Sequence, residues 1–210
     1  MFRKLYRPIQ VSGQKGTCGT FSALMMNPRN LFAPALAAVA AGALLSTPAR
    51  AELAVGAAAP AFVTQGAKAG KPFTFDLKKA LKKGPVVVYF YPKAFTKGCT
   101  LEAHAFAEAT DDFAKAGAMV IGMSADDLPT LEKFSTMECR DKFPVAIADA
   151  GIIKNYDVLL TRPGMDATIT KRTSYVIGKD GKIKLSFTDM DYKDHVSKTL
   201  AAVQGLSAKH

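Results

Sequence analysis

A cysteine stands where a buried strand gives way to a helix, and this position suits a reactive thiol. Residues 85–91 form a continuous β-branched and aromatic run, and Cys99 follows in the first turn of a predicted helix. Ligand sites of α/β proteins form at such carboxyl ends of strands. The unpaired N–H groups and positive dipole end of a helix start favour a thiolate over a thiol. Cys99 is therefore a candidate nucleophile, and the alternatives are a buried structural cysteine or half of a structural disulfide.

The residues just before Cys99 can complete such a site. Thr96 precedes it by three residues and can offer a hydroxyl group to the same pocket. Pro92 and Phe95 lie in the same turn and can exclude water from it. A hydroxyl neighbour beside a helix-start cysteine is typical of an activated nucleophile.

The elements that must position this turn alternate between strand and helix. The run at 85–91 is typical of a strand buried on both faces, and apolar residues recur at helical spacing over residues 99–116. The remaining predicted elements are a strand at 118–124, a helix from Asp126 or Asp127 to about Glu138, a strand at 145–148, a short helix around 152–156, strands at 173–177 and 183–187 joined by an Asp-Gly hairpin, and a helix from Asp191. This order predicts an α/β fold with a central mixed β-sheet flanked by helices. Residues 52–71, rich in Ala and Gly, are expected to form a loose N-terminal arm.

Charge is distributed unevenly along the chain. Its 210 residues include 28 Lys and Arg against 18 Asp and Glu, but residues 1–51 hold six of the basic residues and no acidic one. The remaining 22 basic and 18 acidic residues are ordinary for a soluble domain, which argues against a nucleic-acid partner. With 49% hydrophobic and 22% charged residues, the chain is too apolar for a disordered protein and too charged for a bundle of membrane helices.

The acid-free N-terminus is interpreted as a secretory signal, residues 1–51. An apolar run at 31–45 has the length of a signal core and is too short and Ala-rich for a membrane span. Ala49-Arg50-Ala51 follows as a small-x-small cleavage sequence. The signal is expected to start at Met25 or Met26, with residues 1–24 as an upstream extension. This leaves one domain, residues 52–210, in the periplasm or secreted and without membrane contact; the alternative is a buried Ala-rich helix of the fold.

The turn around Cys99 resembles the active-site pattern of the peroxiredoxins, Pro92-x-x-x-Thr96-x-x-Cys99. The sequences Tyr-Phe-Tyr-Pro at 89–92 and Gly-Cys-Thr at 98–100 are similar to the peroxiredoxin Q (bacterioferritin comigratory protein) group of AhpC/TSA-like proteins. Residues 172–177 resemble the later strand that contributes that group's active-site arginine, and the similarity spans about residues 55–205. The resemblance implies a thioredoxin-like fold and thiol-dependent reduction of hydrogen peroxide or alkyl hydroperoxides.

The resemblance also implies a role for each matching residue. Cys99 would be the peroxidatic thiolate that attacks the terminal peroxide oxygen and becomes a sulfenic acid. Arg172, which by position alone would be a surface arginine, would stabilise the thiolate and hydrogen-bond the charge that develops on the leaving oxygen. Thr96 would position the thiolate and the peroxide, and Pro92 would shield them from water.

The residue that resolves the sulfenic acid departs from the commonest pattern of this group. Many members carry a second cysteine five residues after the first, where this chain has His104. Cys139 is then the candidate resolving residue, because Cys18 would leave with the signal. It is expected on the apolar face of its helix, where Arg140 and Lys142 could favour its thiolate. A disulfide needs Cα atoms within about 7 Å, so one or both helix ends would have to unwind; the alternative is an inert cysteine in a one-cysteine enzyme.

Partners follow from the resemblance, and two other functions stay open. The implied substrate is a peroxide and the implied reductant a thioredoxin-like or other thiol, with no cofactor or metal. A monomer is the default for this group, with a dimer as the alternative. The first other function is a thiol–disulfide oxidoreductase, although Thr96 stands where its Cys-x-x-Cys motif would begin. The second is a non-catalytic redox-sensing module that a Cys99–Cys139 bridge would switch.

The other titratable residues near these motifs are interpreted as structural. Glu102 is expected to complement the N-terminus of its helix, and His104 to be a polar residue one turn further on. His195 and Tyr192 are expected on the solvated surface of the last helix. Their spacing matches no standard metal site.

Overall fold

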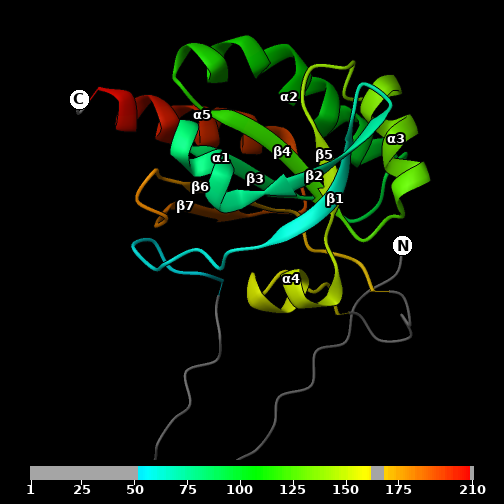
Figure 1. Cartoon of the computed structure of the whole chain (residues 1–210), viewed down its shortest axis with the longest axis horizontal. Helices are drawn as coiled ribbons and strands as arrows, with labels where there is room; N and C mark the ends of the chain where they lie inside the picture. The colour runs from blue at the N-terminus through cyan, green and yellow to red at the C-terminus, as the bar shows by residue number, and fades with distance from the viewer. Residues whose placement is uncertain (1–51, 162–167, 209–210) are drawn as a thin grey trace, which may run out of the picture. The chain divides into compact units, whose positions relative to one another are not determined.

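Seven strands form one mixed sheet at the centre of the residues that a computed structural model describes, 52–161 and 168–208 (Figure 1). The strands are β1 (Val63–Lys68), β2 (Lys71–Asp76), β3 (Val86–Phe90), β4 (Met119–Ser124), β5 (Val145–Ile147), β6 (Thr173–Ile177) and β7 (Ile183–Thr188). The helices are α1 (Leu77–Lys83), α2 (Lys97–Lys115), α3 (Leu128–Met137), α4 (Ala150–Asn155) and α5 (Lys193–Ser207). The secretory signal predicted for residues 1–51 lies outside the described residues.

Strand β3 lies inside the sheet, whose order is β2-β1-β5-β4-β3-β6-β7. It runs parallel to β4 and antiparallel to β6, while β4 runs parallel to β5. All five of its residues are buried, because helices cover both faces of the sheet. The strand predicted at 85–91 is thus confirmed with one residue fewer at each end.

Two apolar layers pack on the two faces of the sheet. One layer joins α1 and α4 to side chains such as Val88 and Ile121. The other joins α2, α3 and α5 to Val87, Tyr89 and the two cysteines. Figure 1 shows α2 and α4 on opposite sides of the sheet. The predicted α/β fold with a central mixed sheet flanked by helices is confirmed.

Aspartates cap the starts of α3 and α4, and the sequence predicts the first of these two caps. Asp127 accepts a hydrogen bond from the N–H of Thr130 at 3.0 Å, and Asp149 accepts one from Ile152 at 2.8 Å. Each satisfies a backbone donor that the first turn of a helix leaves unpaired. Helix α5, predicted from Asp191, begins two residues later at Lys193.

The loose arm predicted for residues 52–71 is wrong for its second half. Strand β1 pairs with β2 on one side and with β5 on the other. A Cβ at Gly66 would lie 2.5 Å from the carbonyl oxygen of Val145, so only glycine allows this close strand approach. The glycine and alanine content that suggested a loose arm thus serves tight strand packing.

None of the helices within the described residues is long and apolar enough to cross a membrane.

Candidate active site

Cys99 lies in the first turn of α2, just beyond the carboxyl end of β3, as the sequence predicts. Only 2% of it is exposed. Thr96 is the residue before the helix, so Cys99 is the third helical residue. The thiol therefore lies among the backbone N–H groups that have no partner inside the helix.

Arg172 reaches this thiol from a distant part of the chain. It immediately precedes β6, whose Thr173 pairs with Phe90 at the carboxyl end of β3. Its Nη2 atom donates to the Sγ atom of Cys99 over 3.6 Å. A Cβ at Gly98 would lie 3.1 Å from the same nitrogen, so glycine leaves room for the guanidinium. Arg172 is only 4% exposed, so the expectation from its position alone, a surface arginine, is wrong.

Glu102 forms a buried ion pair with Arg172. The Nη1 atom of Arg172 donates to Oε2 of Glu102, whose side chain is fully buried. Its other oxygen, Oε1, has no hydrogen-bond partner. Burial raises the pKa of Glu102 to about 8, against the opposing effect of Arg172. The expectation that Glu102 complements the helix N-terminus is wrong, because its partner is Arg172, which lies 70 residues away and just before β6.

His195 is buried beside this pair, so its predicted place on the solvated surface is wrong. Its Nδ1 atom lies 2.8 Å from the hydroxyl of Ser174 and 3.8 Å from Oε1 of Glu102. Its Nε2 atom donates to the carbonyl of Asp189 at 2.9 Å. Burial lowers its pKa, which favours the neutral ring. Thr199 follows His195 by four residues and is also buried, so the two share the inner face of α5. This spacing is the sequence signal that could have predicted the burial of His195.

The other predicted site residues near Cys99 in sequence lie in the turn before α2. Thr96 is exposed, and its hydroxyl donates to the carbonyl of Lys93 at 2.9 Å rather than capping the helix. Pro92 is half-buried. Phe95 is 43% exposed, and its ring packs edge-on against Phe134. Asp126, which sequence analysis assigned only to a helix start, accepts a hydrogen bond from the N–H of Ala94 at 2.7 Å and anchors this turn.

Cys139 lies just beyond the end of α3 and is fully buried. It and Cys99 are both free thiols, and their side chains belong to the same apolar layer. Burial raises the pKa of Cys139, and the charges of Glu138 and Asp141 add to this effect. The expectation that Arg140 and Lys142 favour its thiolate is therefore wrong, since both side chains pair with carboxylates of α2.

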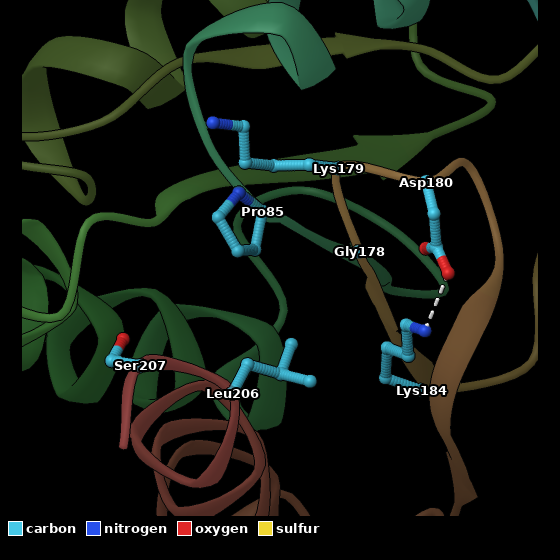
Figure 2. Close-up of a pocket in the computed structure, with 7 residues that line it drawn as sticks. All are labelled: Pro85, Gly178, Lys179, Asp180, Lys184, Leu206 and Ser207. Atoms are coloured by element: carbon cyan, nitrogen blue, oxygen red, sulfur yellow. Dashed lines mark hydrogen bonds and ion pairs between the residues drawn. The ribbon is translucent and has the colours of Figure 1, made fainter. Parts of the chain in front are cut away.

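Figure 2 shows a pocket of the structure, whose volume is about 540 Å³. It is lined by Pro85, Gly178, Lys179, Asp180, Lys184, Leu206 and Ser207. Pro85 immediately precedes β3, whereas Cys99 follows the other end of this strand. Because none of the predicted site residues lines this pocket, it is not part of the candidate active site.

The mixed sheet and the helix-start cysteine beside an arginine define a thiol protein of the thioredoxin-like class. The family model described as AhpC/TSA family matches residues 55–186, and the chain belongs to this family.

Among named proteins, the chain is similar to peroxiredoxin Q and Bcp. Chloroplastic peroxiredoxin Q of Populus jackii is 38% identical over 136 residues, which cover 63% of this chain and 61% of that protein. Peroxiredoxin Bcp of Escherichia coli K12 is 34% identical over 112 residues, covering 52% of this chain and 72% of the relative. The chain thus spans about three fifths of the length of the chloroplastic relative.

A solved structure has the same fold. The crystal structure of peroxidoxin BcpB from Mycobacterium tuberculosis superposes with a TM-score of 0.64 at 29% sequence identity. The match covers 73% of this chain and 98% of the BcpB chain. The predicted thioredoxin-like fold is therefore confirmed.

Proposed function

We propose that this chain is a thiol-dependent peroxidase that reduces hydrogen peroxide or alkyl hydroperoxides with Cys99. The observation that carries the proposal is the contact between the Cys99 sulfur and the Arg172 guanidinium, 3.6 Å, at the start of a helix. Arg172 thus holds a fixed positive charge and an N–H donor against the sulfur that would attack the peroxide. The proposal agrees with the names of the relatives, peroxiredoxin Q and Bcp.

The first step oxidises Cys99. Its thiolate attacks the terminal oxygen of the peroxide, an S–O bond forms, and the O–O bond breaks. The leaving oxygen takes a proton and departs as water or an alcohol, and Cys99 becomes a sulfenic acid. Arg172 stabilises the negative charge first on sulfur and then on the leaving oxygen, because its donors are fixed before the reaction starts.

Thr96 and Pro92 prepare the peroxide for this attack. The Thr96 proton is committed to the carbonyl of Lys93, so its oxygen remains as an acceptor for the O–H of the peroxide. Pro92 has no backbone N–H that could hold a competing water, and its half-buried ring shields the sulfur.

Cys139 resolves the sulfenic acid. Its sulfur attacks the Cys99 sulfur, an S–S bond forms, and the oxygen leaves as water with the thiol proton. A thioredoxin-type dithiol then reduces the disulfide by exchange, returns both thiols and becomes oxidised itself.

The protein acts as a monomer in the periplasm or after secretion. The support for this location is the acid-free N-terminus with an apolar core at 31–45 and a small-x-small sequence before residue 52. The reductant must then reach the same compartment.

Two single substitutions test this cycle. Cys99→Ser should abolish peroxide consumption with a thioredoxin-type donor, because serine cannot replace the thiolate. Cys139→Ser should react once at Cys99 and then stall or over-oxidise. Full steady-state activity of Cys139→Ser with the same donor would refute the resolving role, and full activity of Cys99→Ser would refute the proposed function.

A further inference from the structure

One hydrogen-bonded pair and two ion pairs join one face of α2 to the segment around Cys139. In order along α2 they are His104–Glu138 at 2.7 Å, Glu108–Arg140 at 3.3 Å and Asp111–Lys142 at 4.0 Å. We call these three pairs the clamp. The α2 residues are four and three positions apart, so they share one face of the helix, and their partners are every second residue from 138 to 142.

The clamp holds the resolving cysteine from both sides in the chain. Glu138 precedes Cys139 and Arg140 follows it, and both are bound to α2, the helix that carries Cys99. His104 and Glu138 form the least exposed pair, with 30% and 17% of their side chains exposed. His104 occupies the position, five residues after Cys99, where many peroxiredoxin Q proteins carry a second cysteine.

The backbone held by the clamp is strained. Arg140 and Asp141 have φ angles of 50° and 59°, in the left-handed region that residues other than glycine rarely adopt. Two such residues in succession favour another conformation once their contacts are lost. The clamp and the strain therefore act in opposite directions on this segment.

Disulfide formation requires the two sulfur atoms to approach each other, and the clamped segment carries one of them. Cys139 and Cys99 are buried and unbonded, whereas a disulfide holds its sulfur atoms about 2.05 Å apart. When the Cys139 thiol attacks the Cys99 sulfenic acid, the S–S bond replaces the S–O bond and one water leaves. Any interaction present only in the closed segment raises the barrier to this step.

We propose that His104, Glu108 and Asp111 are positioning residues that keep the Cys139 segment closed and thereby set the rate of disulfide formation. This inference rests on the proposed peroxidase function. A slower resolution leaves the Cys99 sulfenic acid exposed to a second peroxide for longer. That peroxide transfers one oxygen to give a sulfinic acid and leaves as water or an alcohol, so the clamp also sets how easily the enzyme is inactivated.

Opening of the segment can be measured without peroxide, by the rate at which a thiol reagent alkylates Cys139 in the reduced full-length protein. Peptide mapping separates Cys139 from Cys18 and Cys99. His104→Ala and Glu108→Gln should each speed alkylation of Cys139 about two- to fivefold, the range expected for exposed or half-exposed pairs. Glu108→Lys should exceed Glu108→Gln, because it repels Arg140.

Asp112→Asn is the matched control. It removes a negative charge from α2 next to Asp111, but its partner is Lys115 of the same helix at 3.0 Å. Its alkylation rate should equal that of the wild type. Salt at about 1 M should speed alkylation of the wild type more than that of Glu108→Gln, because it screens pairs that the variant lacks.

The catalytic consequence is measured by adding one equivalent of hydrogen peroxide, quenching at intervals and determining the oxidation state of each cysteine by mass spectrometry. In His104→Ala and Glu108→Gln, Cys99 should be oxidised at the wild-type rate. Disulfide formation should be faster by the same factor as alkylation, and less sulfinic acid should accumulate under excess peroxide.

The two possible failures are distinguishable. If the clamp variants alkylate and form the disulfide no faster than Asp112→Asn, the clamp proposal is overturned while the peroxidase function stands. If Cys99 of the wild type does not react rapidly with peroxide, the proposed function fails, and the clamp's catalytic role fails with it. Rapid alkylation of Cys139 in the clamp variants would then show that the clamp holds the segment closed and that only the reaction of Cys99 with peroxide is missing.

Discussion

Arg172 divides its guanidinium between two acidic groups on the same helix. Nη2 donates to the sulfur of Cys99 and Nη1 to Glu102, three residues further along α2. When Glu102 is protonated, the positive charge is available to the Cys99 thiolate; an ionised Glu102 competes for it. Burial raises the pKa of Glu102 to about 8, so this carboxyl can gain or lose a proton near neutral pH.

Replacement of Arg172 tests the contact that carries the proposed function. Arg172→Ala should slow oxidation of Cys99 by hydrogen peroxide about 100-fold or more, the usual loss for a fixed donor to a developing charge. Arg172→Lys should lose less, because it keeps the charge but not the planar fork. The measurement is the rate of loss of the free Cys99 thiol. Lys193→Ala, an exposed residue of α5, should react at the wild-type rate; an equal loss there would contradict the assignment.

Glu102→Gln tests the raised pKa of the buried carboxyl. In the folded protein the pKa is about 8, above the ordinary value of 4.5. As pH rises, the unfolded chain therefore releases this proton at a lower pH than the folded protein does. The protonated carboxyl stabilises the folded state fully below pH 4.5, and this contribution is lost as pH rises towards 8. The glutamine variant has no such proton, so its melting temperature should fall less than that of the wild type between pH 5 and 8. Parallel profiles of the two proteins would exclude the raised pKa.

At the scale of elements, the loop between β7 and α5 is held by two buried donors. His195 donates to the carbonyl of Asp189 and Arg172 to the neighbouring carbonyl of Met190, at 2.9 and 3.1 Å. The ring of His195 also packs on Phe187, with centroids 4.8 Å apart. The loop thus couples the last helix to the arginine that contacts Cys99.

His195→Phe should separate hydrogen bonding from packing in this loop. Phenylalanine can keep the ring contact with Phe187 but leaves Ser174 and the Asp189 carbonyl without their partner. The expected loss is about 1–3 kcal/mol of the free energy of unfolding, the cost of buried unsatisfied groups, measured by urea denaturation. No loss of stability would mean that these hydrogen bonds contribute little.

Local sequence patterns predicted the elements around the site better than the site's buried ions. The strands and helices from residue 85 onward are continuous apolar or periodic segments, and Asp127 marks a helix start. Strand β1 was not predicted, because Gly66 and Ala67 have little strand propensity. These residues instead allow close packing against β5. A local sequence pattern cannot predict a strand whose formation depends on packing against a strand distant in the sequence.

The candidate site divides in the same way. Cys99, Thr96 and Pro92 lie in one short turn that a motif can reveal. The burial of Glu102 depends on Arg172, 70 residues away, and a charged residue with no visible partner is ordinarily placed on the surface. The His104–Glu138 pair was not predicted for the same reason, since His104 lies in α2 and Glu138 just after α3.

At the scale of the whole molecule, we expect one apolar layer to contribute to stability alone and the other to carry the reactive cysteines as well. Both cysteines belong to the layer of α2, α3 and α5, whereas Ile121 is fully buried in the layer of α1 and α4. Ile121→Ala should cost about 2–5 kcal/mol of the free energy of unfolding through a cavity. The folded variant should still oxidise Cys99 at the wild-type rate, measured well below its melting temperature. A large loss of that rate would show that the layers are not separable.

The N-terminus is tested by processing of the full chain in a secreting bacterial host. Because Ala49-Arg50-Ala51 is a small-x-small sequence, the protein recovered from the periplasm or medium should begin at Glu52. N-terminal sequencing and intact mass give the result. An unprocessed chain that stays in the cytosol of such a host would contradict a secretory signal.

The central claim is that Cys99 reacts with peroxide and Cys139 resolves the product. The most direct measurement adds one equivalent of hydrogen peroxide to the fully reduced protein, followed by rapid quenching, thiol blocking and mass spectrometry. A fast product that lacks two hydrogens and maps to a Cys99–Cys139 disulfide is the predicted result. Oxygen that accumulates on Cys99 beside a free Cys139 would contradict resolution by Cys139. The absence of a fast reaction at either sulfur would contradict the peroxidase itself.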